Sequence, residues 1–187
     1  TLLTANMVGT GTIVMVTSIG PLIMNTASIT TTVQSSSTSR CTTLAVTQGT
    51  LVLGAASSLI CSSTATWNGG SLDITSGTLQ CTTFTLNGPT LTLTAGTLTP
   101  TASFVLNTGL FTYGGTATLG ATPTFTQNAG TVTFNKTYAQ ATTGTYSLVA
   151  GNLILAAQVI LSTGIFSSSG ASTRTIGFGA SVSSGSA

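Results

Sequence analysis

Residues 78–99 read TLQCTTFTLNGPTLTLTAGTLT, and this stretch indicates its own local structure clearly. Apolar residues alternate with threonine in two short runs, one around Phe84 and one around Leu91. Alternation with a period of two is typical of a β-strand that buries one face. Asn87 and Gly88 separate the runs, and both residue types readily adopt the backbone conformations of tight corners. The stretch predicts short strands joined by a sharp corner, with threonine on the exposed face.

The same pattern returns at a regular interval along the chain. The three cysteines are evenly spaced, and apolar residues, asparagines and glycines recur with similar steps. Repetition at a fixed period of about 20 residues is typical of a solenoid. The repeated positions are Cys41, Cys61 and Cys81; a first apolar column of Leu44, Ala65, Phe84, Phe104, Phe125, Tyr146 and Phe166; a second of Leu51, Leu72, Leu91, Phe111, Val132 and Leu153; a third that begins Leu59, Leu79, Leu98; and Asn68, Asn87, Asn107 and Asn128.

We therefore predict an all-β fold, a parallel β-helix (β-solenoid) with coils of about 20 residues. The 187 residues would make roughly nine such coils. One coil cannot bury its inner face, whereas stacked coils bury each inner residue between its equivalents above and below. Aligned asparagines can form a hydrogen-bonded ladder along the stack. The cysteines are expected to form a ladder of small buried residues about 4.8 Å apart, in which one disulfide would leave an odd thiol.

The pattern is weaker at the start of the chain. Residues 1–40 keep strand-like pieces but lack the asparagine and glycine punctuation. We expect divergent N-terminal coils or an arm there, serving as a cap or as an inter-subunit contact. Residues 41–187 are expected to form the regular repeats.

The composition argues against an enzyme. Threonine, serine and glycine contribute 43, 23 and 22 residues, there is no histidine, and the formal charges are those of Arg40, Asp73, Lys136 and Arg174. Acid–base and nucleophilic catalysis draw mainly on histidine, acids, lysine and activated cysteine. We expect no catalytic residues, no cofactor and no metal site. Nucleic acid is not an expected partner, because phosphate binding needs clustered lysine and arginine. A transmembrane span is not expected either, because no apolar run approaches about 18 residues.

The predicted ends of the stack suggest self-assembly. No helix or charged segment is expected after the last coil, and an uncovered strand edge is a template for another chain. A head-to-tail contact between identical subunits that does not close produces a filament. We expect a structural subunit of an extracellular filament whose partner is another copy of itself. The expected assembly residues are Ile13, Val14, Met15, Val16, Leu22, Ile23 and Met24 at one end, and Arg174, Ile176, Phe178 and Val182 at the other. The alternative is a fragment of a longer solenoid, with further coils on each side.

A resemblance supports an extracellular role. Residues 164–179 read GIFSSSGASTRTIGFG and resemble repeats of large Thr/Ser/Gly-rich adhesin-like surface proteins and viral tail-fibre-like proteins. In those proteins similar runs lie between units like LTLTAGTLT, which occupies residues 91–99 here. The resemblance implies a location outside the cell, on the cell surface or on the virion surface. It also implies the alternative function of an adhesive segment of a larger fibre, with other surface components or glycans as partners.

Two further patterns carry weaker hypotheses. Outward hydroxyl pairs could form a ladder like those of ice-binding proteins, although Ser103 and Val105 interrupt the threonines and threonine occurs on every predicted face. These pairs are Thr64/Thr66, Thr83/Thr85, Thr124/Thr126 and Thr145/Ser147. Residues 135–137 also form a glycosylation sequon, which chance alone could produce in a threonine-rich chain.

Overall fold

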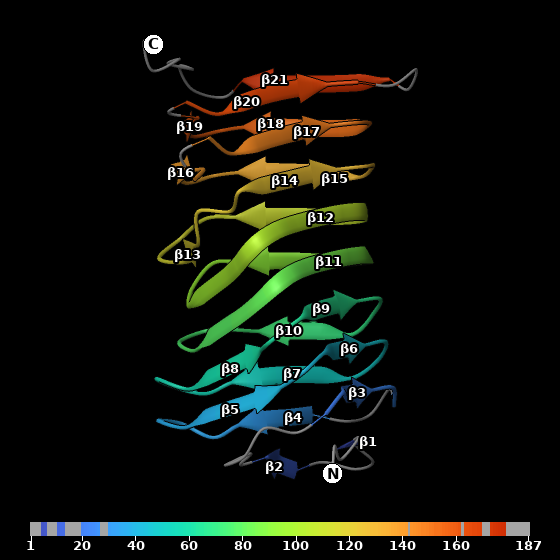
Figure 1. The fold of residues 1–187 in the computed structure, drawn as a ribbon, viewed down its shortest axis with the longest axis vertical. Coiled ribbons are helices and arrows are strands. Elements are labelled where there is room, and N and C mark those ends of the chain that lie inside the picture. Colours follow the sequence, from blue (N-terminus) through green and yellow to red (C-terminus); the bar gives the residue numbers. More distant parts are fainter. Residues whose placement is uncertain are drawn as a thin grey trace.

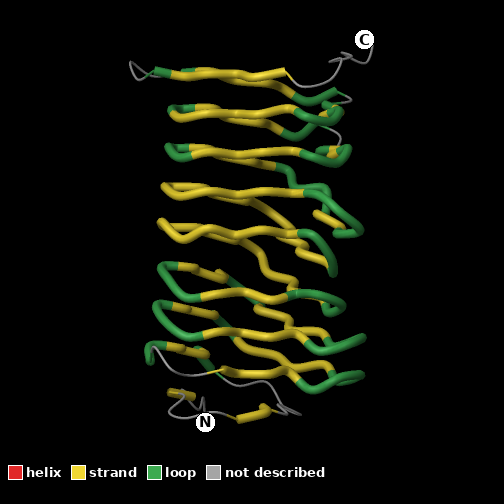
Figure 2. The backbone as a smooth tube through the Cα atoms, turned by 180° about the vertical axis from the view of Figure 1, so that it is seen from behind, coloured by secondary structure: helices red, strands yellow, loops and turns green. Residues whose placement is uncertain are grey.

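The structure, a computed structural model, describes residues 5–6, 11–13, 20–26, 30–141, 143–161, 163–169 and 173–178. Within these ranges every regular element is a β-strand, and no helix is long and apolar enough to cross a membrane. The strands wind into coils that stack into a rod, with the N-terminal coils at one end and the C-terminal coils at the other (Figure 1). The tube in Figure 2 shows successive coils lying one above another.

Each coil contributes strands to three faces of the rod. The long strands β11 (Thr78–Leu93) and β12 (Thr97–Tyr113) pass along all three: their starts lie on the third face, their middles on the first and their ends on the second. The other first-face strands, in stacking order, are β1 (Ala5–Asn6), β3 (Leu22–Met24), β6 (Leu44–Val46), β9 (Thr64–Trp67), β14 (Thr124–Gln127), β17 (Thr145–Leu148) and β20 (Ile165–Ser168).

The remaining strands complete the other two faces. The second face contains β2 (Gly11–Ile13), β4 (Thr30–Val33), β7 (Thr50–Leu53), β10 (Ser71–Asp73), β15 (Thr131–Phe134), β18 (Gly151–Leu155) and β21 (Arg174–Phe178). The third face contains β5 (Thr38–Cys41), β8 (Ser58–Cys61) and β13 (Thr118–Leu119), and a separate pair of strands, β16 (Tyr138–Ala139) and β19 (Val159–Ile160), follows in the later coils. Neighbouring described strands pair in parallel, as between β11 and β12 or between β14 and β17.

The predicted fold class is confirmed, with a small change in the number of coils. The described chain makes about seven turns of about 21 residues, which are fewer and slightly longer than the coils we expected. The coils are not of equal length, as three strand pairings show: Leu22 pairs with Leu44, Ala65 with Phe84, and Leu153 with Ile176. The step along the chain from one partner to the other differs among these pairs, because the corners, rather than the strands, take up extra residues.

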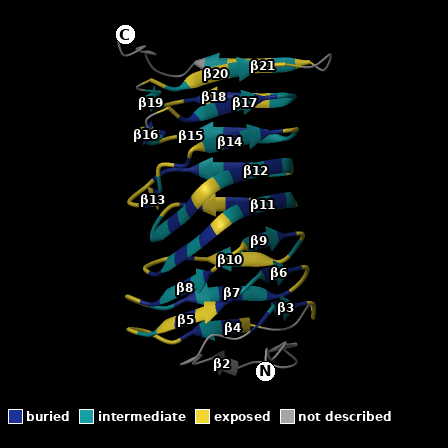
Figure 3. Cartoon of the chain, in the orientation of Figure 1, coloured by how far each residue is buried: buried dark blue, intermediate teal, exposed yellow. Residues whose placement is uncertain are grey.

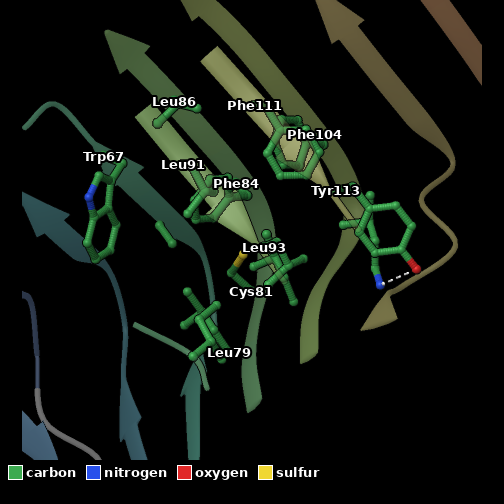
Figure 4. Packing of buried hydrophobic residues seen from close by; sticks show 14 of the residues in the cluster. Trp67, Leu79, Cys81, Phe84, Leu86, Leu91, Leu93, Phe104, Phe111 and Tyr113 are labelled. Carbon is green, nitrogen blue, oxygen red and sulfur yellow. Dashed lines mark hydrogen bonds between the residues drawn. The ribbon is translucent and has the colours of Figure 1, made fainter. Parts of the chain in front are cut away.

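The strand register matches the first apolar column. Leu44 pairs with Ala65, and the pairing then continues through Phe84, Phe104, Phe125, Tyr146 and Phe166. Phe104 and Phe125 stack with ring centroids 4.5 Å apart, and Phe125 and Tyr146 follow at 4.8 Å. Figure 4 shows the inward side chains around Phe84 and Phe104 filling the space between the faces. From Phe84 to Phe166 the column therefore forms a continuous aromatic stack along the core.

The expected divergence of residues 1–40 can be compared with the coils that follow. Strands β3, β4 and β5 pair in register with β6, β7 and β8. The described part of this region therefore belongs to the same stack. Its assignment as a cap or as an inter-subunit contact stays a prediction.

Candidate functional site: the C-terminal coil edge

The last described coil consists of β20 on the first face and β21 on the second. Strand β20 pairs with β17 and strand β21 pairs with β18, so each has one edge that no described strand occupies. In Figure 1 these two strands lie at the C-terminal end of the rod. The free N–H and C=O groups of a parallel edge can pair with another strand.

Phe166 continues the core at this edge without being covered. It pairs with Tyr146, and their rings stack with centroids 5.6 Å apart and an interplanar angle of 14°. Phe104, Phe125 and Tyr146 are at most 1% exposed, whereas Phe166 is 41% exposed. One face of the Phe166 ring thus packs on the core, and the other has no neighbouring coil among the described residues.

Ile176 has the same position on the second face. It pairs with Leu153, which is 2% exposed, yet Ile176 itself is 37% exposed. Ile165 pairs with Thr145 in an outward column and is 62% exposed. Figure 3 shows β20 largely in the colour of exposed residues. Three of the four exposed large apolar residues in the described chain therefore lie on this coil; the fourth is Ile154, on β18.

Arg174 occurs at the position where earlier coils have a corner glycine. It pairs with Gly151, and Gly130 and Gly109 precede Gly151 in the same column. A Cβ atom on Gly151 would lie 2.2 Å from the carbonyl oxygen of Gly130, so those corners stack without room for a side chain. The Arg174 guanidinium donates a hydrogen bond to Ser168 Oγ at 3.0 Å. The last coil therefore departs from the regular corner and carries a positive charge there.

The expected assembly residues at the other end have different surroundings. Leu22 and Met24 are buried in the core, and β3 has a paired neighbour on each side, β1 and β6. Ile23 is half-buried, and Ile13 belongs to β2, where it pairs with Val33. Val14, Met15, Val16 and Val182 lie outside the described residues. Phe178 belongs to β21 and pairs with Leu155, so the C-terminal group of Arg174, Ile176 and Phe178 lies on one strand.

Sequence reasoning missed Ile165 and the exposure of Phe166. The repeat places Phe166 last in the first apolar column, and the structure pairs it with Tyr146. The position of Phe166 as the last member of the column could have indicated its exposure, because a terminal member has a neighbour on one side only. Ile165 interrupts an outward column of threonine and serine, which was a second signal.

The asparagine column forms a ladder at the corner between the first and second faces. Asn87 donates to Asn68, Asn107 to Asn87, and Asn128 to Asn107, with Nδ2–Oδ1 distances of 2.7, 2.6 and 2.7 Å. Each inner asparagine both donates and accepts. This arrangement satisfies the amides and ties four coils together, which is a structural role.

The outward threonines of the first face are half-buried and partly hydrogen-bonded to one another. Ser103 Oγ donates to Thr83 Oγ1 at 3.1 Å, and Val105 stands between Thr85 and Thr126 in the register. The hydroxyl ladder is thus broken at one coil. Ice binding by this face stays a hypothesis.

The described residues contain no group of three or more histidine, cysteine or acidic side chains that could hold a metal ion. The carboxylate of Asp73 accepts hydrogen bonds from the backbone N–H and the hydroxyl of Thr75. Lys136 Nζ donates to the carbonyl oxygen of Ala117 and lies 5.9 Å from the centre of the Tyr113 ring. These two charged groups therefore stabilise local loops.

No protein-family model matches the chain, and neither do curated proteins or solved structures.

Proposed function

We propose that this chain is a non-enzymatic structural subunit of an extracellular filament, which grows by head-to-tail stacking of identical β-solenoids. One observation carries the proposal: Phe166 and Ile176 occupy inward columns of the core but remain 41% and 37% exposed. They occupy core positions that no further coil of the described residues covers. The surface that fits them best is another coil with the same spacing of inward side chains.

Apolar burial and strand pairing would both stabilise the contact between subunits. Complete burial of a large apolar side chain contributes about 1.5–3 kcal/mol relative to exposure. Phe166 and Ile176 would gain part of this amount, because each is already more than half buried. Added parallel strands would also satisfy the free backbone groups of β20 and β21.

A second copy offers a matching surface at its opposite end. Strands β1 and β2 are the first described strands of their faces, and they pair only with β3 and β4 among the described residues. In a parallel stack, the edge below the first coil is complementary to the edge above the last. Such a contact uses two different surfaces and does not close upon itself, so it extends into a filament.

The runner-up is an adhesive segment of a larger surface or viral fibre. In that case further coils of the same polypeptide cover Phe166 and Ile176, and the outward faces bind other surface components or glycans. The mass of the intact native chain separates the two proposals. About 18.5 kDa supports the subunit, and a far larger mass supports the segment.

Electron cryo-microscopy of the purified chain tests the filament directly. We expect long filaments with an axial repeat near 4.8 Å, the spacing of neighbouring strands. The first face stacks nine described strands from β1 to β20, which at that spacing correspond to a subunit step of about 43 Å. Discrete short rods would retain the fold and reject self-assembly.

A matched pair of variants tests the contact itself. Ile176→Asp places a carboxylate at the junction and is expected to abolish filaments. Ile154→Asp makes the same change at a similarly exposed isoleucine, 39% exposed on the side of the rod, and should leave filaments intact. Ile165→Asp, at a position 62% exposed, is a second junction variant that should not affect folding of the subunit. Normal filaments from both junction variants would refute the proposed contact.

A further inference from the structure

The cysteine column contains one close pair of sulfur atoms. Cys41 is the last residue of β5 and Cys61 the last residue of β8, and the two are directly opposed in the parallel register. Their Sγ atoms are 3.1 Å apart, and the side chains are 1% and 2% exposed. Cys81, on β11 in the next coil, is also a buried free thiol. Of the three described cysteines, Cys41 and Cys61 are the two whose thiols form a hydrogen bond with each other.

The backbone geometry at this pair suits a cross-coil bond. Neighbouring strands lie about 4.7–4.9 Å apart, which falls within the Cα separation of about 4.4–6.8 Å found for disulfides. A disulfide needs an S–S distance of about 2.05 Å, so the two Sγ atoms must approach by about 1 Å. Side-chain rotations, together with a small approach of the two Cβ atoms to the roughly 3.5–4.5 Å of a disulfide, can supply this movement.

The pair lies in the N-terminal part of the stack. Strand β5 pairs with β8, which also pairs with β11. The backbone N–H of Thr42, next to Cys41, donates to the carbonyl oxygen of Gly20. A covalent link at this place would tie two adjacent coils together.

We propose that Cys41 and Cys61 form a disulfide between adjacent coils when the protein meets a small-molecule disulfide, while Cys81 remains a thiol. The Cys41 thiolate attacks the small disulfide, which forms a mixed disulfide and releases one small thiol. The Cys61 sulfur then attacks Cys41 Sγ, which forms the protein disulfide and releases the second small thiol. The protein loses two protons and two electrons, and the small disulfide gains them as it becomes two small thiols.

The electrostatics of the pair favour this order of attack. A hydrogen bond from the Cys61 thiol lowers the pKa of Cys41, and burial opposes that effect. The same hydrogen bond and burial raise the pKa of Cys61. Burial raises the pKa of Cys81 to about 12. Because the thiolate is the nucleophile, Cys41 is the first of the three to react when a local opening of the coil exposes it.

Thiol counting with oxidised glutathione tests the inference, which does not depend on the filament. The chain is incubated at pH 8 under native conditions, quenched with acid and titrated for thiols in denaturant. We expect the count to fall from three to one, with no glutathione retained and a mass loss of about 2 Da. Chymotryptic peptides should link Cys41 to Cys61, because leucines or a tryptophan separate all three cysteines.

Two variants locate the bond. The thiol count of Cys81→Ala should fall from two to none at the wild-type rate, because this variant keeps both Cys41 and Cys61. Cys41→Ala should lose intramolecular disulfide formation at least tenfold, because Cys61 and Cys81 lack the close contact. If Cys41→Ala fails to fold, the peptide map of the wild-type chain still decides. A Cys61–Cys81 link, three persistent thiols or a stable glutathione adduct would each overturn the inference.

Discussion

At the scale of single residues, Phe104 and Phe166 show how position in the stack decides the role of a side chain. Both belong to the first apolar column, and both stack on an aromatic neighbour. Phe104 has rings on both sides, Phe84 at 5.3 Å and Phe125 at 4.5 Å between centroids, and is 0% exposed. Phe166 has an aromatic neighbour on one side and is 41% exposed. The same residue type is therefore enclosed in one coil and partly exposed in another.

Phe104→Asp is expected to abolish folding. An unpaired carboxylate between two stacked rings costs more than the net stability of a domain of this size, about 5–15 kcal/mol. Circular dichroism and size-exclusion chromatography of the purified variant provide the measurement. Phe166→Asp is the matched control and should keep the fold, because the new carboxylate can reach solvent. A folded Phe104→Asp variant would show that this column does not point inward.

The fold should lose stability at alkaline pH, because two of its tyrosines are buried. Burial raises the pKa of Tyr138, and burial together with the nearby Tyr138 raises the pKa of Tyr146 well above its ordinary value. In the unfolded chain both hydroxyls ionise near pH 10. Their contribution is therefore complete below about pH 10 and is lost as the pH rises above it.

Chemical denaturation between pH 9 and pH 11 measures this effect. The free energy of unfolding should fall by up to about 1.4 kcal/mol per pH unit for each tyrosine. Tyr146→Phe loses the hydrogen bond to Gln127 Oε1, so its stability at pH 8 should be lower. Above pH 10 its free energy of unfolding should fall less steeply with pH than that of the wild-type chain, because one buried tyrosine fewer contributes to the fall. Equal slopes for the two proteins would contradict the burial of the Tyr146 hydroxyl.

At the scale of elements, the corners control how closely the coils stack. Gly130 has a φ of 79°, and a Cβ atom there would lie 2.3 Å from the carbonyl oxygen of Gly109. Gly109 and Gly151 have equally close backbone neighbours. The strands can pair at their normal spacing because these corners carry no side chains.

Gly130→Ala should destabilise the chain by more than the roughly 1 kcal/mol of backbone strain, because the methyl group also separates two corners. Gly177→Ala is the matched control: no atom lies within 4 Å of its added Cβ, and its φ is not in the left-handed region. Thermal unfolding of both variants gives the comparison. Similar melting temperatures would mean that the corners tolerate side chains.

At the scale of the whole molecule, contacts between coils replace the charge interactions of ordinary soluble proteins. The chain has four formally charged residues, and its core runs through successive coils without interruption. Each coil depends on its neighbours to bury its inner face, so stability accumulates along the stack. The same property means that a coil without a covering neighbour exposes apolar side chains, as Phe166 and Ile176 show.

Stability should therefore be nearly independent of sodium chloride. The Debye length falls from about 30 Å to about 3 Å between 0.01 M and 1 M salt, which removes most long-range charge effects. We expect the free energy of unfolding to change by less than about 0.5 kcal/mol over this range, which is the scale of one surface ion pair. Sodium sulfate should stabilise the fold, because excluded salts strengthen apolar burial. A strong dependence on sodium chloride would indicate a charge contact that the stack does not explain.

Periodicity alone made the fold predictable. The alternation around Phe84 and Leu91 decides which side chains face inward, and the regular repeat along the chain decides which of them stack. The asparagine ladder and the first apolar column followed from the same counting, because equivalent residues of a solenoid must lie one above another.

Other features depend on distances between coils that no local pattern encodes. Gln127 lies in a column with Leu106 and Leu148 and is fully buried, and its amide nitrogen donates to the carbonyl oxygens of Gly130 and Asn152. Gly130 belongs to the same coil as Gln127 and Asn152 belongs to the next coil, and the lengths of the corners bring both carbonyl groups to one amide. The choice of Cys41 and Cys61 as the close pair has the same origin. Equal spacing in the sequence makes the three cysteines equivalent, and only the stacked coils bring two of the sulfur atoms into contact.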